Sequence, residues 1–231
     1  ALLRWNHPQR GLLAPGEFMR VAQESGHIEA IDWQLFEAAC TSALRAAPAP
    51  AFLTLNVSAL HLRHADFDQR LVRLLARIGF APARLVIEVT EGSLLDDPEH
   101  VRATLERLRA MGIGAALDDF GTGYSSLSYL HSLPLRMLKI DRAFVHALDE
   151  GARATTTVVA AILALARALD IHVIAEGIET PEQKAALVRM GCEFGQGYLL
   201  GRPAPFAQAV EPAVLATVGQ GMLDMANRRI G

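Results

Sequence analysis

The chain has 231 residues, of which 51% are hydrophobic and 20% are charged, a balance typical of a folded globular protein and not of a disordered segment. Its net charge of −3 argues against a surface that binds a nucleic acid polymer, so a phosphate ligand must be held by a local site or by metal ions. The two cysteines, Cys40 and Cys192, form neither a disulfide framework nor a zinc pattern, which suits a reducing cytosol.

Short apolar runs alternate with amphipathic stretches along the chain. The runs predict strands, and the amphipathic stretches predict helices. The expected strands are Leu2–Trp5, Phe52–Val57, Leu85–Val89, Gly114–Leu117, Met137–Ile140, His172–Ala175, Cys192–Phe194 and Tyr198–Leu199. The expected helices are Asp32–Arg45, Phe67–Ile78, Asp97–Met111, Thr155–Leu169, Thr180–Met190 and Pro205–Val218.

Repeated strand–helix units of this length imply parallel strands with right-handed crossovers. About eight units in one chain predict a (β/α)8 barrel, with a doubly wound open sheet as the alternative. No Gly-x-Gly-x-x-Gly motif follows a strand, so dinucleotide binding has no support. No linker divides the chain, and we therefore expect residues 1–231 to form a single domain.

The pair Asp118-Asp119 leaves a buried strand and enters the glycine-rich turn Phe120-Gly121-Thr122-Gly123-Tyr124. Adjacent carboxylates raise each other's cost of ionisation unless a cation neutralises them, and Mg²⁺ prefers oxygen ligands of this kind. A lone Asp-Asp pair is more often a solvated turn, so the argument depends on the other strand ends.

Polar side chains also stand at the ends of four other expected strands. In a barrel, the carboxyl ends of the strands face one mouth, which carries the chemistry. Each residue alone has an ordinary structural interpretation, but so many acids gathered at one mouth need a cation to offset the cost of burial. The residues expected to converge are Asn56, Glu88, Asp118, Asp119, Lys139 and Glu176.

Seven motifs in order resemble those of the EAL domain family, bacterial phosphodiesterases of cyclic di-GMP. Together they cover the chain from Ala1 to about Pro205. They are Ala1-Leu2-Leu3-Arg4-Trp5, Leu55-Asn56-Val57-Ser58, Glu88-Val89-Thr90-Glu91, Asp118-Asp119-Phe120-Gly121-Thr122-Gly123-Tyr124-Ser125-Ser126-Leu127, Leu138-Lys139-Ile140-Asp141, Ala175-Glu176-Gly177-Ile178-Glu179-Thr180 and Gln196-Gly197-Tyr198-Leu199-Leu200-Gly201-Arg202-Pro203.

The resemblance implies a modified (β/α)8 barrel whose first strand is antiparallel to the rest. It implies Mg²⁺ or Mn²⁺, with two ions expected, and hydrolysis of one phosphodiester bond of cyclic di-GMP to give linear pGpG. It also implies a homodimer and a sensory or diguanylate cyclase domain upstream. Ca²⁺ is expected to inhibit, because it prefers more ligands and a looser geometry than Mg²⁺.

The resemblance also assigns roles to residues of this chain. Metal ligands are expected at Asn56, Glu88, Asp118, Asp119 and Glu176, with Asp118 as the bridge between two ions. Glu176 and Lys139 are the expected catalytic residues, and Arg4 and Gln196 are expected to meet the substrate. Glu91 and Glu179 are expected to brace the loop after Asp119 and the dimer contact.

The family is named for a Glu-Ala-Leu motif whose glutamate is a metal ligand, and here the sequence starts at Ala1-Leu2. The simplest explanation is that the sequence starts one residue late within a longer protein. The alternative is a true loss of this ligand, which would lower the metal affinity and impair catalysis, so the expected activity is conditional on the glutamate. We expect the domain to be cytoplasmic and the full-length protein to be compatible with a membrane anchor. Three functions stay open at this stage. They are an active phosphodiesterase, which the intact acids favour, an impaired domain that acts as a cyclic di-GMP receptor, and another Mg²⁺-dependent barrel enzyme acting on a carbonyl substrate.

Overall fold

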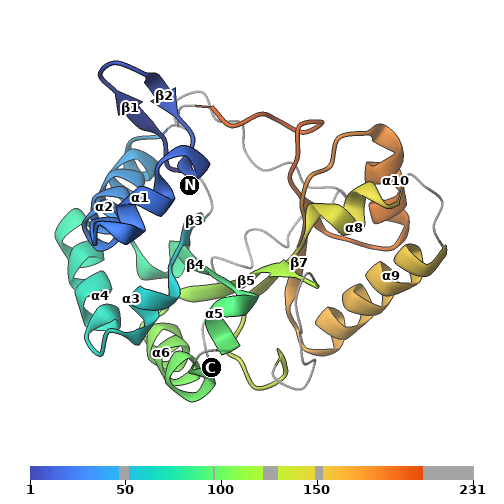
Figure 1. Cartoon of the computed structure of the whole chain (residues 1–231). Helices are drawn as coiled ribbons and strands as arrows, with labels where there is room; N and C mark the ends of the chain where they lie inside the picture. Colours follow the sequence, from blue (N-terminus) through green and yellow to red (C-terminus); the bar gives the residue numbers. More distant parts are fainter. Residues whose placement is uncertain (47–51, 96, 122–129, 149–152, 205–231) are drawn as a thin grey trace.

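The computed structural model of the chain describes residues 1–46, 52–95, 97–121, 130–148 and 153–204 (Figure 1). The predicted helix Pro205–Val218 lies outside the described residues, as does most of the segment that follows Asp119.

Six parallel strands form a curled sheet with helices around its outside (Figure 1). Their order in the sheet follows their order in the chain, with no reversal of direction between neighbours. A doubly wound sheet reverses its strand order at a switch point, so this order excludes the open-sheet alternative. The strands are β3 (Leu53–Asn56), β4 (Leu85–Thr90), β5 (Gly114–Phe120), β6 (Met137–Ile140), β7 (His172–Ala175) and β8 (Phe194–Gly195).

The antiparallel part of the described fold is a separate hairpin of β1 (Trp5–His7) and β2 (Gly11–Leu13). The first expected strand, Leu2–Trp5, was wrong in its bounds, since strand structure begins only at Trp5. A tight turn explains the pairing. The Nδ1 atom of His7 accepts hydrogen bonds from the backbone N–H groups that follow it, and Gly11 adopts φ +73°.

The last expected strand, Tyr198–Leu199, was also wrong, because these residues lie in a turn. Gly197 packs so closely on the backbone of Ile178 that a side chain at Gly197 would overlap it. The N–H of Leu199 donates to Ile178 O, and that of Leu200 donates back to Gly197 O. These two hydrogen bonds use the backbone groups that a strand would need for its neighbour.

The predicted helices are present in the described residues, with the expected caps. Asp97 and Thr180 accept hydrogen bonds from N–H groups in the first turns of α6 and α10, and Gly79 at φ +80° ends α4. None of the described helices is long and apolar enough to cross a membrane. The helices are α1 (Met19–Glu24), α2 (Ile28–Arg45), α3 (Ala59–Arg63), α4 (Phe67–Ile78), α5 (Glu91–Leu95), α6 (Pro98–Ala110), α8 (Arg142–His146), α9 (Arg153–Ala168) and α10 (Pro181–Arg189), with short 3-10 turns at Pro15–Glu17 and Pro82–Arg84.

The sheet has two apolar faces. Its outer face and the helices share the large core, and a second, smaller cluster lies apart from that core, formed by Val86, Ala116, Met137, Ile174 and Phe194. Successive side chains of a strand point to opposite faces of the sheet. The residue two positions after each member of the cluster therefore lies on the same face as that member. Those positions hold Glu88, Asp118, Lys139, Glu176 and Gln196.

Candidate active site

Lys139 on β6 is the centre of the site. Its ammonium nitrogen lies 3.2 Å from Glu88 Oε2, 2.9 Å from Asp118 Oδ1 and 2.6 Å from Glu176 Oε1. Glu88, Asp118 and Lys139 are all buried. The ammonium group of Lys139 therefore contacts one carboxylate on β4, one on β5 and one directly after β7. The barrel interpretation of the sequence predicts this convergence.

Asp118 and Asp119 lie at an irregularity of the sheet. The pairing of β5 with β6 shifts between Leu117 and Phe120, and Asp119 adopts the left-handed φ of 56°. A local bulge of this kind re-aims side chains. The N–H of Asp119 donates to Asp118 Oδ1 at 3.0 Å, which fixes the Asp118 carboxylate against the backbone of its neighbour.

Glu176 follows β7 directly, and its N–H donates to the carbonyl of Ile140 at 3.0 Å. Gln196 stands at the same level after β8 and donates from Nε2 to Glu176 Oε1 at 2.5 Å. Gln196 therefore contacts a carboxylate of the cluster, an arrangement that the sequence did not indicate.

The electrostatics of the site follow from burial and from the crowding of like charges. Burial raises the pKa of Glu176 to about 7, even though Lys139 lowers it. Burial and the neighbouring charge of Asp118 also raise the pKa of Asp119. Burial lowers the pKa of Lys139, but Glu88, Glu176 and Asp118 outweigh burial and hold it above its ordinary value. Lys139 is therefore fully charged in the metal-free protein.

Asn56 and Arg4 lie outside this network of contacts. Asn56 ends β3, pairs in register with Glu88 and is exposed. Arg4 is exposed as well, and it donates to the carbonyl of Leu3. Nothing in the described residues tests the predicted contact of Arg4 with a substrate phosphate.

The two acids expected to brace the loop lie in different surroundings. Glu91 begins α5 and is buried, and within the described part of the chain neither of its carboxylate oxygens has a hydrogen-bond partner. Glu179 is exposed, and its Oε1 lies 3.7 Å from His146 Nε2. Their roles towards the loop stay predictions, since most of that loop is not described.

The donor atoms present suit a hard divalent cation. Asp118, Asp119 and Glu176 each offer an oxygen, and these oxygens lie within 4.8 Å of one another. Glu88 adds a fourth carboxylate through its contact with Lys139, and Asn56 offers a neutral oxygen beside it in the sheet. Oxygen-only donors of this kind favour Mg²⁺, Mn²⁺ or Ca²⁺ over softer metals.

The sequence reasoning gave no role to Asp141 or to two glycines near the site. The charge of Asp141 adds to the rise in the pKa of Asp119, which places Asp141 close to the acidic cluster. Gly121 and Gly177 have positive φ and lie tightly against α8. The position of Asp141 at the end of β6 was the available signal, whereas the glycine contacts are visible only in three dimensions.

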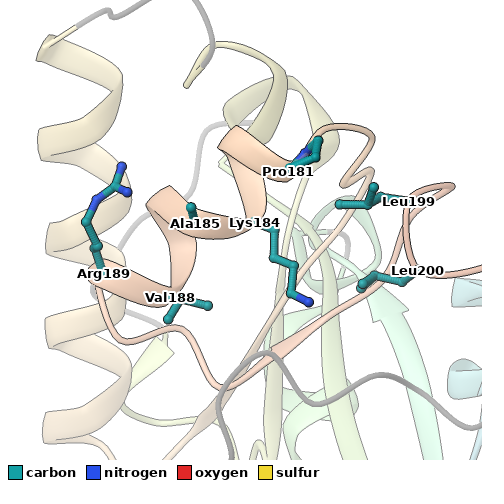
Figure 2. Close-up of a pocket in the computed structure, with 7 residues that line it drawn as sticks. All are labelled: Pro181, Lys184, Ala185, Val188, Arg189, Leu199 and Leu200. Carbon is teal, nitrogen blue, oxygen red and sulfur yellow. The ribbon is translucent and has the colours of Figure 1, made fainter.

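A groove on the outer surface is separate from this site. It lies between α10 and the turn at Leu199 and Leu200, and Lys184 and Val188 stand on the side of α10 that faces this turn (Figure 2). The described residues that line the groove include no carboxylate and none of the predicted site residues.

The fold and the cluster define a barrel-type α/β protein with a cluster of acidic residues at the carboxyl ends of its strands that could hold a metal ion. The EAL domain family model matches residues 1–203, and the chain belongs to this family. Its fold class, an α/β barrel architecture with a curled parallel sheet and an antiparallel hairpin, is therefore confirmed.

Two curated relatives come from Pseudomonas aeruginosa. The bifunctional diguanylate cyclase/cyclic di-GMP phosphodiesterase MucR is 43% identical over 211 residues, which are 90% of this chain and 31% of MucR. The cyclic di-GMP phosphodiesterase RocR is 37% identical over 206 residues, which are 88% of this chain and 52% of RocR. The chain thus spans about a third to a half of these relatives.

Solved structures agree with the sequence relatives. The MucR phosphodiesterase in complex with c-di-GMP has a TM-score of 0.83 and 43% identity, covering 89% of this chain and 84% of that chain. The EAL enzyme Bd1971 in its cGMP-bound form has a TM-score of 0.81 and 32% identity, covering 90% of this chain and 58% of that chain.

Proposed function

We propose that this chain is a metal-dependent phosphodiesterase that hydrolyses cyclic di-GMP to linear pGpG. The observation that carries the proposal is the convergence of Glu88, Asp118 and Glu176 on Lys139, with Asp119 and Gln196 beside them. The names of the relatives supply the substrate.

The proposed roles follow from the charges and positions of the side chains. Two divalent cations would be held by Asn56, Glu88, Asp118, Asp119 and Glu176, and they would supply a nucleophile from water and neutralise the phosphate. Asp118 would be the ligand shared by both ions, and in the metal-free fold its Oδ1 contacts Lys139 and accepts the N–H of Asp119. Lys139 holds a positive charge where the attacking oxygen becomes negative.

Glu176 and Gln196 complete the chemistry of the site. With a pKa of about 7, Glu176 can accept a proton from water near neutral pH, which suits a general base. Gln196 holds one oxygen of Glu176 and so orients the other. Arg4 and Gln196 are the proposed contacts to the substrate, and Glu91 and Glu179 the proposed supports of the loop and of the dimer.

The proposed ions are Mg²⁺ or Mn²⁺. Mg²⁺ requires near-ideal octahedral geometry, whereas Ca²⁺ accepts more ligands at longer distances. Ca²⁺ in the same oxygen cluster would therefore bind without aligning the nucleophile, and we expect it to inhibit.

Full activity is proposed to require a glutamate in front of Ala1. The amino group of Ala1 donates to Thr54 O, two residues before the end of β3. Thr54 lies on β3, whose last residue, Asn56, is a proposed metal ligand. A residue in front of Ala1 would thus begin within reach of the proposed metal ligands.

The proposed setting is a cytoplasmic homodimer within a longer signalling protein. MucR combines a diguanylate cyclase with its phosphodiesterase, which supports an upstream sensory or cyclase domain. In this setting residues 1–231 are a single EAL domain, and a membrane anchor elsewhere in the protein is compatible with it. The ligand is the cyclic dinucleotide and not a nucleic acid polymer.

The decisive experiment incubates the chain, with and without a glutamate placed before Ala1, with cyclic di-GMP and Mg²⁺. Chromatography should show pGpG, with a higher rate when the glutamate is present. Tight binding without pGpG in both forms would favour the alternative, a catalytically impaired cyclic di-GMP receptor. The absence of both binding and turnover would contradict both functions.

A further inference from the structure

The short helix α8 lies between the end of β5, which carries Asp119, and the loop after β7, which carries Glu176. It follows β6 after Asp141, whose carboxylate caps it by accepting a hydrogen bond from Ala143 N–H at 2.8 Å. Ile140, the last residue of β6, pairs with Phe120 on one side and accepts the N–H of Glu176 on the other. The start of α8 is therefore fixed between these two segments.

One side of α8 contacts the chain directly after β5 through Phe144 and Gly121. Gly121 adopts φ +95°, and a Cβ atom placed there would lie 2.6 Å from Cε2 of Phe144. Real Cβ atoms do not approach so closely, so the Phe144 ring lies directly against the bare backbone of Gly121. Gly121 is only two residues from Asp119.

The other side of α8 holds the loop after Glu176. Gly177 adopts φ +71°, and a Cβ atom there would overlap the Cβ of Arg142 and lie 3.3 Å from its Cα. In the same loop, Glu179 Oε1 lies 3.7 Å from His146 Nε2 on α8. One five-residue helix thus contacts Gly121, directly after β5, and Gly177, directly after Glu176, at glycines that leave no free space.

We propose that α8 sets the spacing between Asp119 and Glu176, and that Phe144 is a positioning residue for cation binding. The inference rests on the proposed function, because it concerns the same carboxylates. The oxygens of Asp118, Asp119 and Glu176 lie within 4.8 Å of one another, and a divalent ion requires them to stay there. Close-packed contacts transmit a shift in one element to its neighbours.

The test is Phe144→Ala, examined by calorimetric titration with Mn²⁺ and by thermal unfolding without metal. We expect the affinity for Mn²⁺ to fall about tenfold, because Gly121, two residues after Asp119, loses the ring that packs on it. Val145→Ala is the matched control, since Val145 lies on the same helix and is fully buried in the core. It should lower the Tm as well but leave the Mn²⁺ affinity within about twofold.

A double mutant separates direct contact from general damage. Gly121→Ala should weaken Mn²⁺ binding through its clash with the ring and through backbone strain at φ +95°, and Phe144→Ala removes the clash but not the strain. The double variant should therefore bind Mn²⁺ no more weakly than Gly121→Ala alone, which is non-additive behaviour. If Phe144→Ala fails to fold, Phe144→Leu, which retains part of the side chain, takes its place.

The outcomes distinguish the two proposals. Wild-type affinity for Mn²⁺ in the Phe144 variant, or fully additive losses in the double variant, overturns the positioning role and leaves the phosphodiesterase proposal intact. A wild-type chain that binds no Mn²⁺ overturns the two-cation proposal and the positioning role with it.

Discussion

The ammonium of Lys139 lies 2.6 Å from Glu176 Oε1, the shortest of its three contacts with carboxylates. Within the metal-free protein, this lysine supplies the positive charge that buried acids require. Once divalent cations also neutralise these acids, the ammonium group of Lys139 can assist catalysis. Lys139 therefore has two roles that can be measured separately, one in stability and one in turnover.

Lys139→Ala should reduce kcat by about 10²-fold to 10³-fold while cyclic di-GMP affinity changes little, because the charge acts on the developing negative charge of the transition state. Initial rates at saturating substrate and equilibrium binding in Ca²⁺ measure the two quantities. A variant that loses binding but keeps kcat would contradict the catalytic assignment.

The same substitution should destabilise the metal-free protein by about 3–5 kcal/mol, because it leaves buried carboxylates without a counter-charge. Saturating Mg²⁺ should restore much of this loss, since the cations take over the charge of the lysine. Urea unfolding with EDTA and with Mg²⁺ gives the comparison. An equal loss in both conditions would show that Lys139 and the cations do not share a site.

Asp118→Ala should abolish turnover while the barrel stays folded, because it removes the ligand proposed to bridge two ions. Asp118→Asn keeps the size of the side chain and removes its charge, so it should be nearly as inactive. Glu106→Gln is the control, since Glu106 pairs with Arg102 on the exposed face of α6. Unchanged turnover in Asp118→Ala would falsify the two-cation mechanism.

The raised pKa of Glu176 predicts that the free energy of unfolding depends on pH. Its pKa of about 7 in the metal-free fold lies above its ordinary value of 4.5, so the folded chain binds a proton more tightly than the unfolded chain. Its stabilising contribution is complete below pH 4.5 and is lost as the pH rises through about 7. Glu176→Gln should remove this part of the pH dependence of the free energy of unfolding.

Metal binding should show the opposite trend, because a cation requires the deprotonated carboxylate. The apparent affinity for Mg²⁺ should rise with pH up to about 7 and then level off. In Glu176→Gln the rise should be weaker and the affinity lower throughout. An affinity for Mg²⁺ that does not change between pH 5.5 and pH 8 would remove Glu176 from the ligand set.

Much of the site could be predicted from sequence because a parallel strand has a simple rule of alternation. Glu88, Asp118 and Lys139 stand two residues beyond apolar side chains of the same face, and the strands containing them were recognisable as short apolar runs. Parallel neighbours in sequence order then bring these positions to one level. The convergence follows from the strand pattern and needs no long-range information.

The errors in the predicted strands arise where hydrogen bonds to the backbone, which the apolar pattern does not reveal, decide the local structure. The apolar run at Tyr198–Leu199 predicts a strand, but these residues form a turn in which the N–H of Leu199 donates to the carbonyl of Ile178. The hairpin at Trp5 depends on the side chain of His7, which no periodicity reveals. The helix α8 has too few residues to show a helical repeat in the sequence. Its contacts with Gly121 and Gly177 therefore could not be predicted.

The final prediction concerns self-association through the segment Phe120–Leu130, which the family resemblance places at a dimer contact. The segment begins next to Asp119, so association and cation geometry are coupled if the dimer holds it. Glu91 is buried beside β5 with both carboxylate oxygens free of partners in the described residues, which suits a support for this segment.

Sedimentation velocity over a range of concentrations, alone and with Mg²⁺ and cyclic di-GMP, should show a dimer that becomes tighter with ligand. Glu91→Gln keeps the shape of the side chain and removes its charge, so it should weaken both the dimer and the turnover. Glu99→Gln, on the exposed part of α6, should change neither. A chain that stays monomeric at high concentration with full activity would exclude the coupling, because the site would then be complete within one protomer.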